Sequence, residues 1–470
     1  MKSRVSVVVA ATLWSCAVLA ARGPDTLDLM QVYQLALQND PQIREADATR
    51  LATREAKPQA WAALLPQVNA TAGYTKSDNA NSQVTLVQRD SSNPSSPLDA
   101  RMITREQDTT TKQYNVELRQ TLFRWDQWVA LKRADSRVAQ AEADFGAASQ
   151  DLMQRTAQRY FDVLAAKDTV DAADASLQAF ARQLEQADKR FEVGLIAITD
   201  VQEARAARDQ AAAAVIAAKR SLSTSQELLR ELTGEPIGSL APPIANLPLK
   251  APDATEDEWV ARALQQNLRV VSARLSADIA KQDIRTARSA YMPSVDLVVS
   301  NSDLDEEGDA TTRNPLGIPT NSPADTTREG DTIGIQVSIP LFAGGGNASR
   351  VRERTYLHRA SRERLERANR ETERVTRDAY LGVQSEISRV QSLRQALQSS
   401  QTALQATEAG FEVGTRTTVD VLDARRRLFD AQTNYSRSRY DYLLNVLRLQ
   451  QATGTLSQAD LERINANLEK

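Results

Sequence analysis

The sequence predicts a mainly α-helical protein with a transmembrane β portion, in which one pattern of helices and strands occurs twice. Three observations lead to this fold class. The segments Phe191–Arg205 and Phe411–Arg425 are identical at eight of fifteen positions. Long stretches without proline space their small and apolar residues three and four apart, which is the heptad pattern of a coiled coil. Between these stretches the period changes to two, which indicates β-strands.

The first 21 residues, 1–21, are interpreted as a secretory signal peptide. Lys2 and Arg4 precede an apolar stretch, and small residues follow near Ala20, where cleavage is expected. Cys16, the one cysteine of the chain, lies inside this segment, and the bulky Trp14 argues against a lipid-anchored cysteine there. The mature chain is therefore expected to have no cysteine and no disulfide.

The duplication defines the expected domains. Ala36–Val68 parallels Ala263–Val295, and a stretch rich in proline and glycine separates the two halves. The expected domains after the signal peptide are a first repeat at 22–240, a linker at 241–254, a second repeat at 255–456 and a C-terminal tail at 457–470.

Two helices are expected to be unusually long. Neither Arg124–Phe191 nor Asn347–Phe411 contains a proline. At about 1.5 Å per residue, a helix of about 65 residues is about 100 Å long. Two shorter helices placed end to end match one long helix, so the predicted object is a pair of long antiparallel coiled coils. The shorter helices, each about half as long, are expected at 27–63, 199–233, 255–291 and 418–452.

Four strands are expected between the helices, two in each half. Strands of about ten residues that are apolar on one face suit a transmembrane β-barrel. Polar segments between them, Asn79–Thr111 and Asp303–Asp331, are expected to be exposed loops. The alternating segments lie near Val68–Tyr74, Val116–Leu122, Val295–Val299 and Ile333–Leu341.

The strand count has a consequence for assembly. Four strands cannot close a membrane barrel, which needs about eight or more, and open sheet edges are not stable in lipid. A barrel built from these strands must therefore be shared between chains. Aromatic residues next to the strands are consistent either with a girdle at the membrane boundary or with ordinary packing. They are Phe123, Trp125, Trp128 and Phe342.

Several stretches of the sequence resemble the TolC family of bacterial outer-membrane channel-tunnel proteins. They include LMQVYQLALQNDPQIREA, LLPQV, the two FEVG segments and ATGTL, and they extend from Leu29 to about Leu461. The resemblance implies a homotrimer with a 12-stranded barrel in the outer membrane of a Gram-negative bacterium and an α-helical tunnel through the periplasm. It also implies an exit duct for tripartite efflux or type I secretion, without a cofactor. Such a duct carries drugs or polypeptides from an inner-membrane pump of the RND, ABC or MFS type, through a periplasmic adaptor.

The two FEVG segments are interpreted as turns at which a long helix reverses into a short one. Gly194 and Gly414 permit the left-handed backbone that a sharp reversal needs. By the resemblance, these turns dock the periplasmic adaptor. The residues concerned are Val193, Gly194, Leu195, Val413, Gly414 and Thr415.

Acidic residues follow each turn. Asp420 and Asp423 are three residues apart and lie on one helical face. By the resemblance, they form two carboxylate rings that gate the narrow end of the tunnel. A solvated helix face is the alternative interpretation of these acids, and it is the favoured one for Glu203 in the first repeat.

Four further residues match positions that close the tip in the TolC family. Thr199, Asp200 and Arg416 correspond to residues that hold neighbouring coils together. Phe411 stands where the family has a tyrosine that bonds to the acid matching Asp200. One hydroxyl of the closing network is therefore missing from this sequence.

Other classes of function have less support in the sequence. A single histidine and no mature cysteine leave no nucleophile–base pair or metal-ligand cluster, so neither an enzyme nor a metal site is expected. The formal net charge of −3 does not indicate a polyanionic binding partner. The arginines of Arg350–Arg377 alternate with glutamates, which argues against a nucleic-acid partner. A periplasmic coiled-coil scaffold without a pore is the alternative function, but a scaffold does not need the amphipathic strands.

Overall fold

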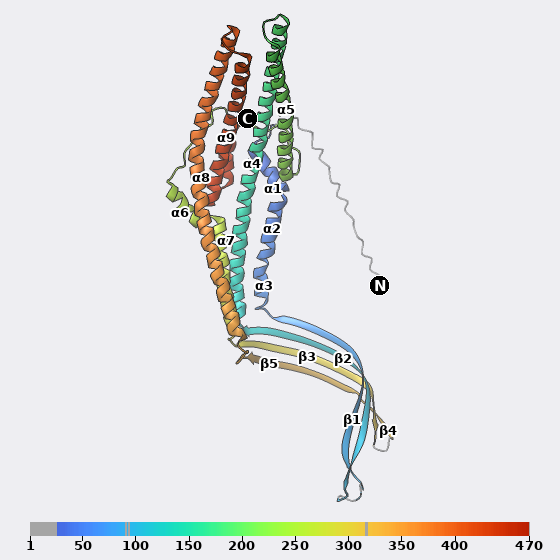
Figure 1. The fold of residues 1–470 in the computed structure, drawn as a ribbon. Helices are drawn as coiled ribbons and strands as arrows, with labels where there is room; N and C mark the ends of the chain where they lie inside the picture. The colour runs from blue at the N-terminus through green and yellow to red at the C-terminus, as the bar shows by residue number, and fades with distance from the viewer. Residues whose placement is uncertain (1–25, 90–91, 93–94, 315–317, 470) are drawn as a thin grey trace, which may run out of the picture. The chain divides into compact units, whose positions relative to one another are not determined.

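The computed structural model describes residues 26–89, 92, 95–314 and 318–469 (Figure 1). Most of these residues lie in helices, which confirms the mainly α-helical fold class. The expected signal peptide lies outside the described residues. The elements in chain order are α1 (Leu29–Asn39), α2 (Pro41–Arg54), α3 (Ala56–Ala62), β1 (Gln67–Gln88), β2 (Leu98–Phe123), α4 (Trp125–Glu192), α5 (Ile198–Thr233), α6 (Glu256–Gln266), α7 (Leu268–Ser289), β3 (Ser294–Arg313), β4 (Pro319–Pro323), β5 (Thr326–Ser338), α8 (Gly346–Glu412), α9 (Thr418–Thr453) and α10 (Gln458–Asn465).

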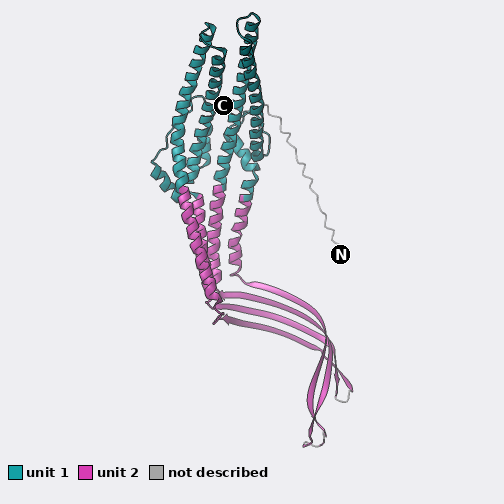
Figure 2. Cartoon of the chain, viewed as in Figure 1, with its two compact units in different colours: residues 1–45, 148–267, 373–470 teal, residues 46–147, 268–372 magenta. Residues whose placement is uncertain are grey.

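The chain divides into two compact units (Figure 2). Unit 1 comprises residues 1–45, 148–267 and 373–470, and unit 2 comprises residues 46–147 and 268–372. Unit 1 contains both helical hairpins and the segment between the repeats, and unit 2 contains the sheet. Both units draw on both sequence repeats, because α4 and α8 each pass from unit 2 into unit 1.

The long helices agree with the prediction. α4 has 68 residues and α8 has 67, and the short helices α5 and α9 have 36 residues each. Within unit 1, α4 with α5 and α8 with α9 form hairpins that reverse at the same end of the unit (Figure 1). None of the helices in the described part of the chain is both long and apolar enough to cross a membrane.

The helices expected at 27–63 and 255–291 are interrupted, so the prediction of single helices there was wrong. In the first stretch, Asp40 is extended (φ −64°, ψ 120°) and precedes Pro41. The proline ring disfavours a helical backbone in the residue before it. In the second stretch, Asn267 has nearly the same backbone (φ −60°, ψ 122°) without a following proline.

Asparagines at these two breaks bind the C-terminal ends of the short helices. Asn39 Nδ2 donates to Thr233 O at 2.7 Å at the end of α5. Asn267 Nδ2 donates to Ala452 O at 2.8 Å near the end of α9. These carbonyls belong to the last helical turn, where no intrahelical donor is available. Both repeats therefore build the same junction between helices.

Aromatic residues form the centre of the core of unit 1. Tyr160 and Phe161 of α4 are 0% and 1% exposed, and their rings meet edge to face at 5.4 Å. Phe161 also stacks on Tyr440 of α9 at 5.6 Å. Tyr440 donates its hydroxyl to Asp168 Oδ2 at 2.7 Å. These contacts hold α4 of the first repeat against α9 of the second.

Unit 2 contains a single antiparallel sheet. β1 pairs with β2, β2 with β3, and β3 with both β4 and β5. The register places Val68, Leu118, Val299 and Ile333 in one row across β1, β2, β3 and β5. The apolar residues of these strands therefore share one face, as their alternation predicts.

The strands are much longer than the ten residues expected, and most of the described residues of the polar segments Asn79–Thr111 and Asp303–Asp331, which were predicted as loops, lie in strands instead. β1, β2 and β3 have 22, 26 and 20 residues. Backbone pairing does not require apolar side chains. A segment such as Thr109–Thr111 keeps the β-branched character of a strand while it carries no apolar face.

The returning strand is interrupted, so five strands replace the four expected. Pro323 ends β4 and has no N–H for the ladder. Beyond it, Ala324 N donates to Gly308 O at 2.8 Å, and Gly308 N donates to Asp325 Oδ1 at 3.1 Å. β4 and β5 pair with different parts of β3, so they act as one broken strand.

The two faces of the sheet differ in polarity. On the apolar face, Val68, Tyr74 and Ile333 are 62%, 71% and 76% exposed. On the opposite face, Thr121 Oγ1 donates to Asp296 Oδ1 at 3.0 Å. The aromatic residues next to the strands are also exposed rather than packed inside the chain. Their exposed fractions are 38% for Phe123, 44% for Trp125, 51% for Trp128 and 88% for Phe342.

Candidate functional site

The first hairpin of unit 1 reverses through a glycine turn. Gly194 has a φ of 75°, and its amide donates to Phe191 O at 2.9 Å. The amide of Leu195 donates to Arg190 O, also at 2.9 Å. These two bonds form a Schellman motif, which satisfies carbonyls at the end of α4. The left-handed residue in this motif is glycine because a Cβ would be strained there.

The second hairpin reverses in the same way. Gly414 has a φ of 80°, and its amide donates to Phe411 O at 3.2 Å. The amide of Thr415 donates to Gly410 O at 2.8 Å. The two FEVG segments therefore make one turn geometry twice, as predicted from their glycines.

The acids after the turns hold the starts of the short helices. Asp420 Oδ2 accepts bonds from Thr417 N at 2.9 Å and from Thr417 Oγ1 at 3.0 Å, and Asp420 N donates to Thr417 Oγ1 at 3.2 Å. This reciprocal pair is a capping box. In the first repeat, Ala197 has no hydroxyl to offer. Only the bond from Ala197 N to Asp200 Oδ2 forms there, at 3.4 Å.

The cap also lowers the pKa of Asp420. Hydrogen bonds from the backbone and side chain of Thr417 lower the pKa of Asp420, and the nearby positive charge of Arg416 lowers it further. Asp423 lies three residues further along the same helix face, and its Oδ1 is 3.6 Å from Arg426 Nη1. Each of the two predicted gating acids therefore has a partner within its own chain.

Phe411 has a partner that the sequence did not indicate. The guanidinium of Arg190, near the end of α4, lies 4.6 Å from the centre of the Phe411 ring, near the end of α8. This cation–π contact joins the two hairpins close to their turns. Of the other predicted tip-closing residues, Thr199 and Arg416 are exposed and Asp200 is half-buried. Within one chain, these three residues do not come together with Phe411 in a network of contacts.

Both turns present apolar side chains to solvent. Val193, Leu195 and Val413 are 70%, 73% and 76% exposed. A Cβ at Gly194 or at Gly414 would meet no atom within 4 Å, so the surface around each turn is open. Apolar side chains exposed in a cluster are typical of a protein interaction site.

Comparison with known proteins identifies the family. The sequence profile described as outer membrane efflux protein matches residues 32–235 and 259–455. The chain belongs to the outer membrane efflux protein family. Its relatives include outer membrane protein TolC of Vibrio cholerae, 37% identical over 446 residues, with 94% of each chain covered. TolC of Escherichia coli is 34% identical, with 94% of this chain and 85% of the relative covered.

This outer membrane efflux protein is also similar to a secretion protein and to two channels of known structure. Alkaline protease secretion protein AprF of Pseudomonas aeruginosa is 27% identical over 94% of this chain and 87% of its own. The Campylobacter jejuni CmeC outer membrane channel superposes with a TM-score of 0.73 at 16% identity, covering 99% and 98% of the two chains. CusC superposes with a TM-score of 0.70 at 18% identity, covering 93% of this chain and 95% of CusC. These two structures show the fold.

The family decides between the two functions that the sequence left open. This outer membrane efflux protein is an outer-membrane exit duct, and not a scaffold without a pore. Its relatives are channels rather than enzymes.

Sequence reasoning missed three residues near the turns: Thr417, Arg190 and Arg426. The pattern Thr417-x-x-Asp420 before an apolar run is a capping-box signature, so the first could have been found. Arg426 follows Asp423 at i,i+3, which is also a readable spacing. The contact of Arg190 with Phe411 depends on how two distant helices are aligned, and no local signal reveals it.

Proposed function

We propose that three copies of the chain close one 12-stranded barrel, and that this homotrimer is the outer component of tripartite efflux or type I secretion machines. The open sheet carries the proposal. In the described part of the chain, β1 has a neighbour on one side only, and β5 likewise. Unpaired strand edges are not stable in lipid, and joining β5 of one copy to β1 of the next removes them. Each repeat, 22–240 and 255–456, contributes one hairpin of the barrel.

The partners follow from the family and from the turns. A periplasmic adaptor docks on the exposed apolar residues at Val193–Leu195 and Val413–Thr415. An inner-membrane pump of the RND, ABC or MFS type supplies drugs or polypeptides. A relative named for protease secretion supports the polypeptide route, and relatives named for efflux support the drug route.

Asp420 and Asp423 form the pore-gating rings, with three copies of each acid in the trimer. Rings of carboxylates in a narrow pore bind cations and select for them. Thr199, Asp200, Phe411 and Arg416 close the tip by contacts between neighbouring coils. The contact of Arg190 with Phe411 supports the closed state from within each chain.

The assembly is tested by mass and by cross-linking. Light scattering in mild detergent should give three times the chain mass. Because Cys16, the one cysteine of the chain, lies in the expected signal peptide, single cysteines placed on β1 and β5 should form covalent oligomers on oxidation. A control pair in register within one chain, Val68→Cys with Leu118→Cys, should cross-link without joining chains. A monodisperse monomer that yields no oligomer from any β1–β5 pair would refute the proposal.

A further inference from the structure

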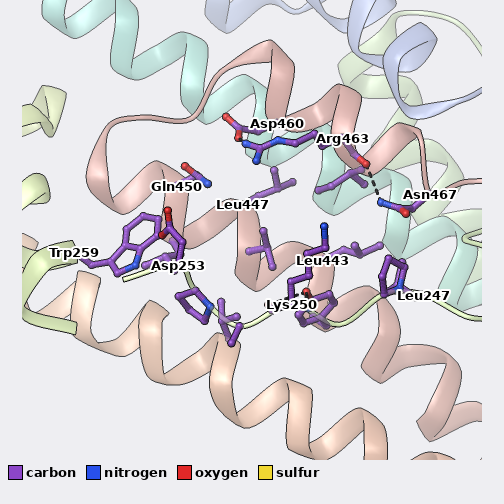
Figure 3. A pocket seen from close by; sticks show the side chains of 18 residues that line it. Leu247, Lys250, Asp253, Trp259, Leu443, Leu447, Gln450, Asp460, Arg463 and Asn467 are labelled. Carbon is purple, nitrogen blue, oxygen red and sulfur yellow. Dashed lines mark hydrogen bonds and ion pairs between the residues drawn. The ribbon is translucent and has the colours of Figure 1, made fainter. Parts of the chain in front are cut away.

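A cavity of about 420 Å³ lies in unit 1, beneath the segment that joins the two repeats (Figure 3). It is lined by that segment and by α6, α8, α9 and α10. Its floor is apolar: Val383, Leu443 and Leu447 are 2%, 4% and 0% exposed. Both the volume and the apolar lining are those of a small-molecule site.

One end of the cavity holds a buried hydrogen-bond donor without an acceptor. Trp259 lines the cavity and is 5% exposed, and its Nε1 has no hydrogen-bond partner. It lies beside Asp253 in the view of the site (Figure 3). Burying an indole N–H without an acceptor is unfavourable, so the site favours a ligand that supplies one.

A cation belongs to the same site. The backbone of Lys250 is fixed by Tyr442, whose hydroxyl accepts from Lys250 N at 2.8 Å and donates to Lys250 O at 3.1 Å. The ammonium group of Lys250 pairs with no acid among the described residues. Lys250 therefore adds a positive charge that nothing in the cavity neutralises.

Each of the two acids that line the cavity lies next to an arginine. Asp253 Oδ1 lies 3.8 Å from Arg262 Nη1. Asp460 accepts bonds from the amide and hydroxyl of Ser457, both at 2.8 Å, and pairs with Arg463. The cavity thus offers the indole N–H of Trp259 and the ammonium of Lys250, while each of its two acids has a cationic neighbour, Arg262 or Arg463.

We propose that this cavity binds a small apolar carboxylate. The hydrocarbon part lies against Leu443 and Leu447, and the carboxylate accepts the indole N–H of Trp259 and is attracted by Lys250. This site is separate from the turns and the sheet, so it stands whether or not the export proposal holds.

The test uses the assembled full chain in an uncharged detergent, with 4-phenylbutyrate as probe. Fluorine NMR of protein labelled with 5-fluorotryptophan should show a saturable shift of the Trp259 signal, which Trp259→Phe identifies. Calorimetric titration should show affinity at least tenfold weaker in Trp259→Phe, which keeps a ring but loses the N–H. Lys250→Met, at an exposed position, should weaken binding to a similar extent.

Two controls make the test decisive. Trp61→Phe removes an indole that lies outside the cavity and should leave the affinity unchanged. The matched alcohol, 4-phenylbutanol, should bind at least tenfold more weakly than the carboxylate. Equal affinity for acid and alcohol would overturn the carboxylate assignment. The absence of saturable binding, or unchanged wild-type affinity in both Trp259→Phe and Lys250→Met, would overturn the site.

Discussion

Tyr160 shows how one side chain can fix a junction in this molecule. It is fully buried on α4, and its hydroxyl donates to Ala241 O at 2.7 Å and lies 3.2 Å from Leu27 O. Burial raises the pKa of Tyr160, because a charged phenolate would lose its hydration. The hydroxyl therefore remains a donor, and it ties the segment between the repeats to the first long helix.

Replacing Tyr160 by phenylalanine should destabilise unit 1 by about 1–3 kcal/mol, because buried carbonyl groups lose their donor. Heat denaturation followed by circular dichroism measures this. Tyr380→Phe is the matched control. It removes an exposed hydroxyl that accepts a bond from Gln384 at 3.2 Å, so a change below about 0.5 kcal/mol is expected. Equal effects of the two variants would show that burial of the Tyr160 hydroxyl contributes nothing.

The pH response of the gate should follow Asp420. Its pKa is lowered, so the carboxylate keeps its charge below the ordinary value of 3.8, and its contribution is lost only as the pH falls through the folded pKa. Block of the channel by a trivalent cation, recorded in planar bilayers, should therefore persist at pH 5 and fade only as the pH falls below 3.8.

Two variants separate the charge of Asp420 from its role in the cap. Asp420→Asn with Asp423→Asn keeps an oxygen that can accept from Thr417 N but removes the charge. It should abolish the trivalent block and leave the helix start intact. Asp420→Ala alone also removes the carboxylate half of the capping box and should lower the thermal midpoint as well. Full trivalent sensitivity in the double asparagine variant would show that these acids do not form the rings.

At the scale of elements, the sheet contains one place where two strands approach very closely. A Cβ built on Gly308 of β3 would lie 2.1 Å from Asp108 O and 2.8 Å from Thr109 Cα of β2. Both of these atoms belong to the backbone, so neither can move aside as a flexible side chain could. The position therefore accepts only glycine.

Gly308→Ala should destabilise the sheet by more than about 3 kcal/mol and lower the yield of assembled protein, because two paired strands must separate. Gly334→Ala in β5 is the control, since a Cβ there meets nothing within 4 Å, and its effect should stay within about 1 kcal/mol. The measurement is the yield of assembled protein after detergent extraction, together with its thermal midpoint. Normal assembly of Gly308→Ala would contradict the close approach.

The elements also show what sequence reasoning can reach. The ends of α4, α5, α8 and α9 were predicted within about two residues, because proline-free heptads and turn glycines mark them locally. The full length of the strands was not predicted, because their outer parts pair through the backbone and carry polar side chains. At the tip, the turn geometry was readable from Gly194 and Gly414. The contact of Arg190 with Phe411 could not be predicted from the sequence, because it joins residues 221 positions apart.

At the scale of the whole molecule, export should depend on the apolar tips. Val193→Asp with Val413→Asp places charges on two exposed side chains, so the fold should be unchanged while adaptor docking is lost. Drug resistance of cells that carry the matching pump and adaptor measures export. Ile216→Asp, an equally exposed apolar position on α5 (71%), should leave export intact. Unchanged resistance in the double variant would place the docking surface elsewhere.

The two hairpins end in similar turns, but Ala197 and Thr417 give the short helices unequal caps. The short helix after Thr417 is fastened by a full reciprocal cap, and the one after Ala197 by a single long bond of 3.4 Å. In the proposed trimer, three copies of each hairpin surround the axis, and we expect the less firmly capped start of α5 to unwind more readily than the start of α9.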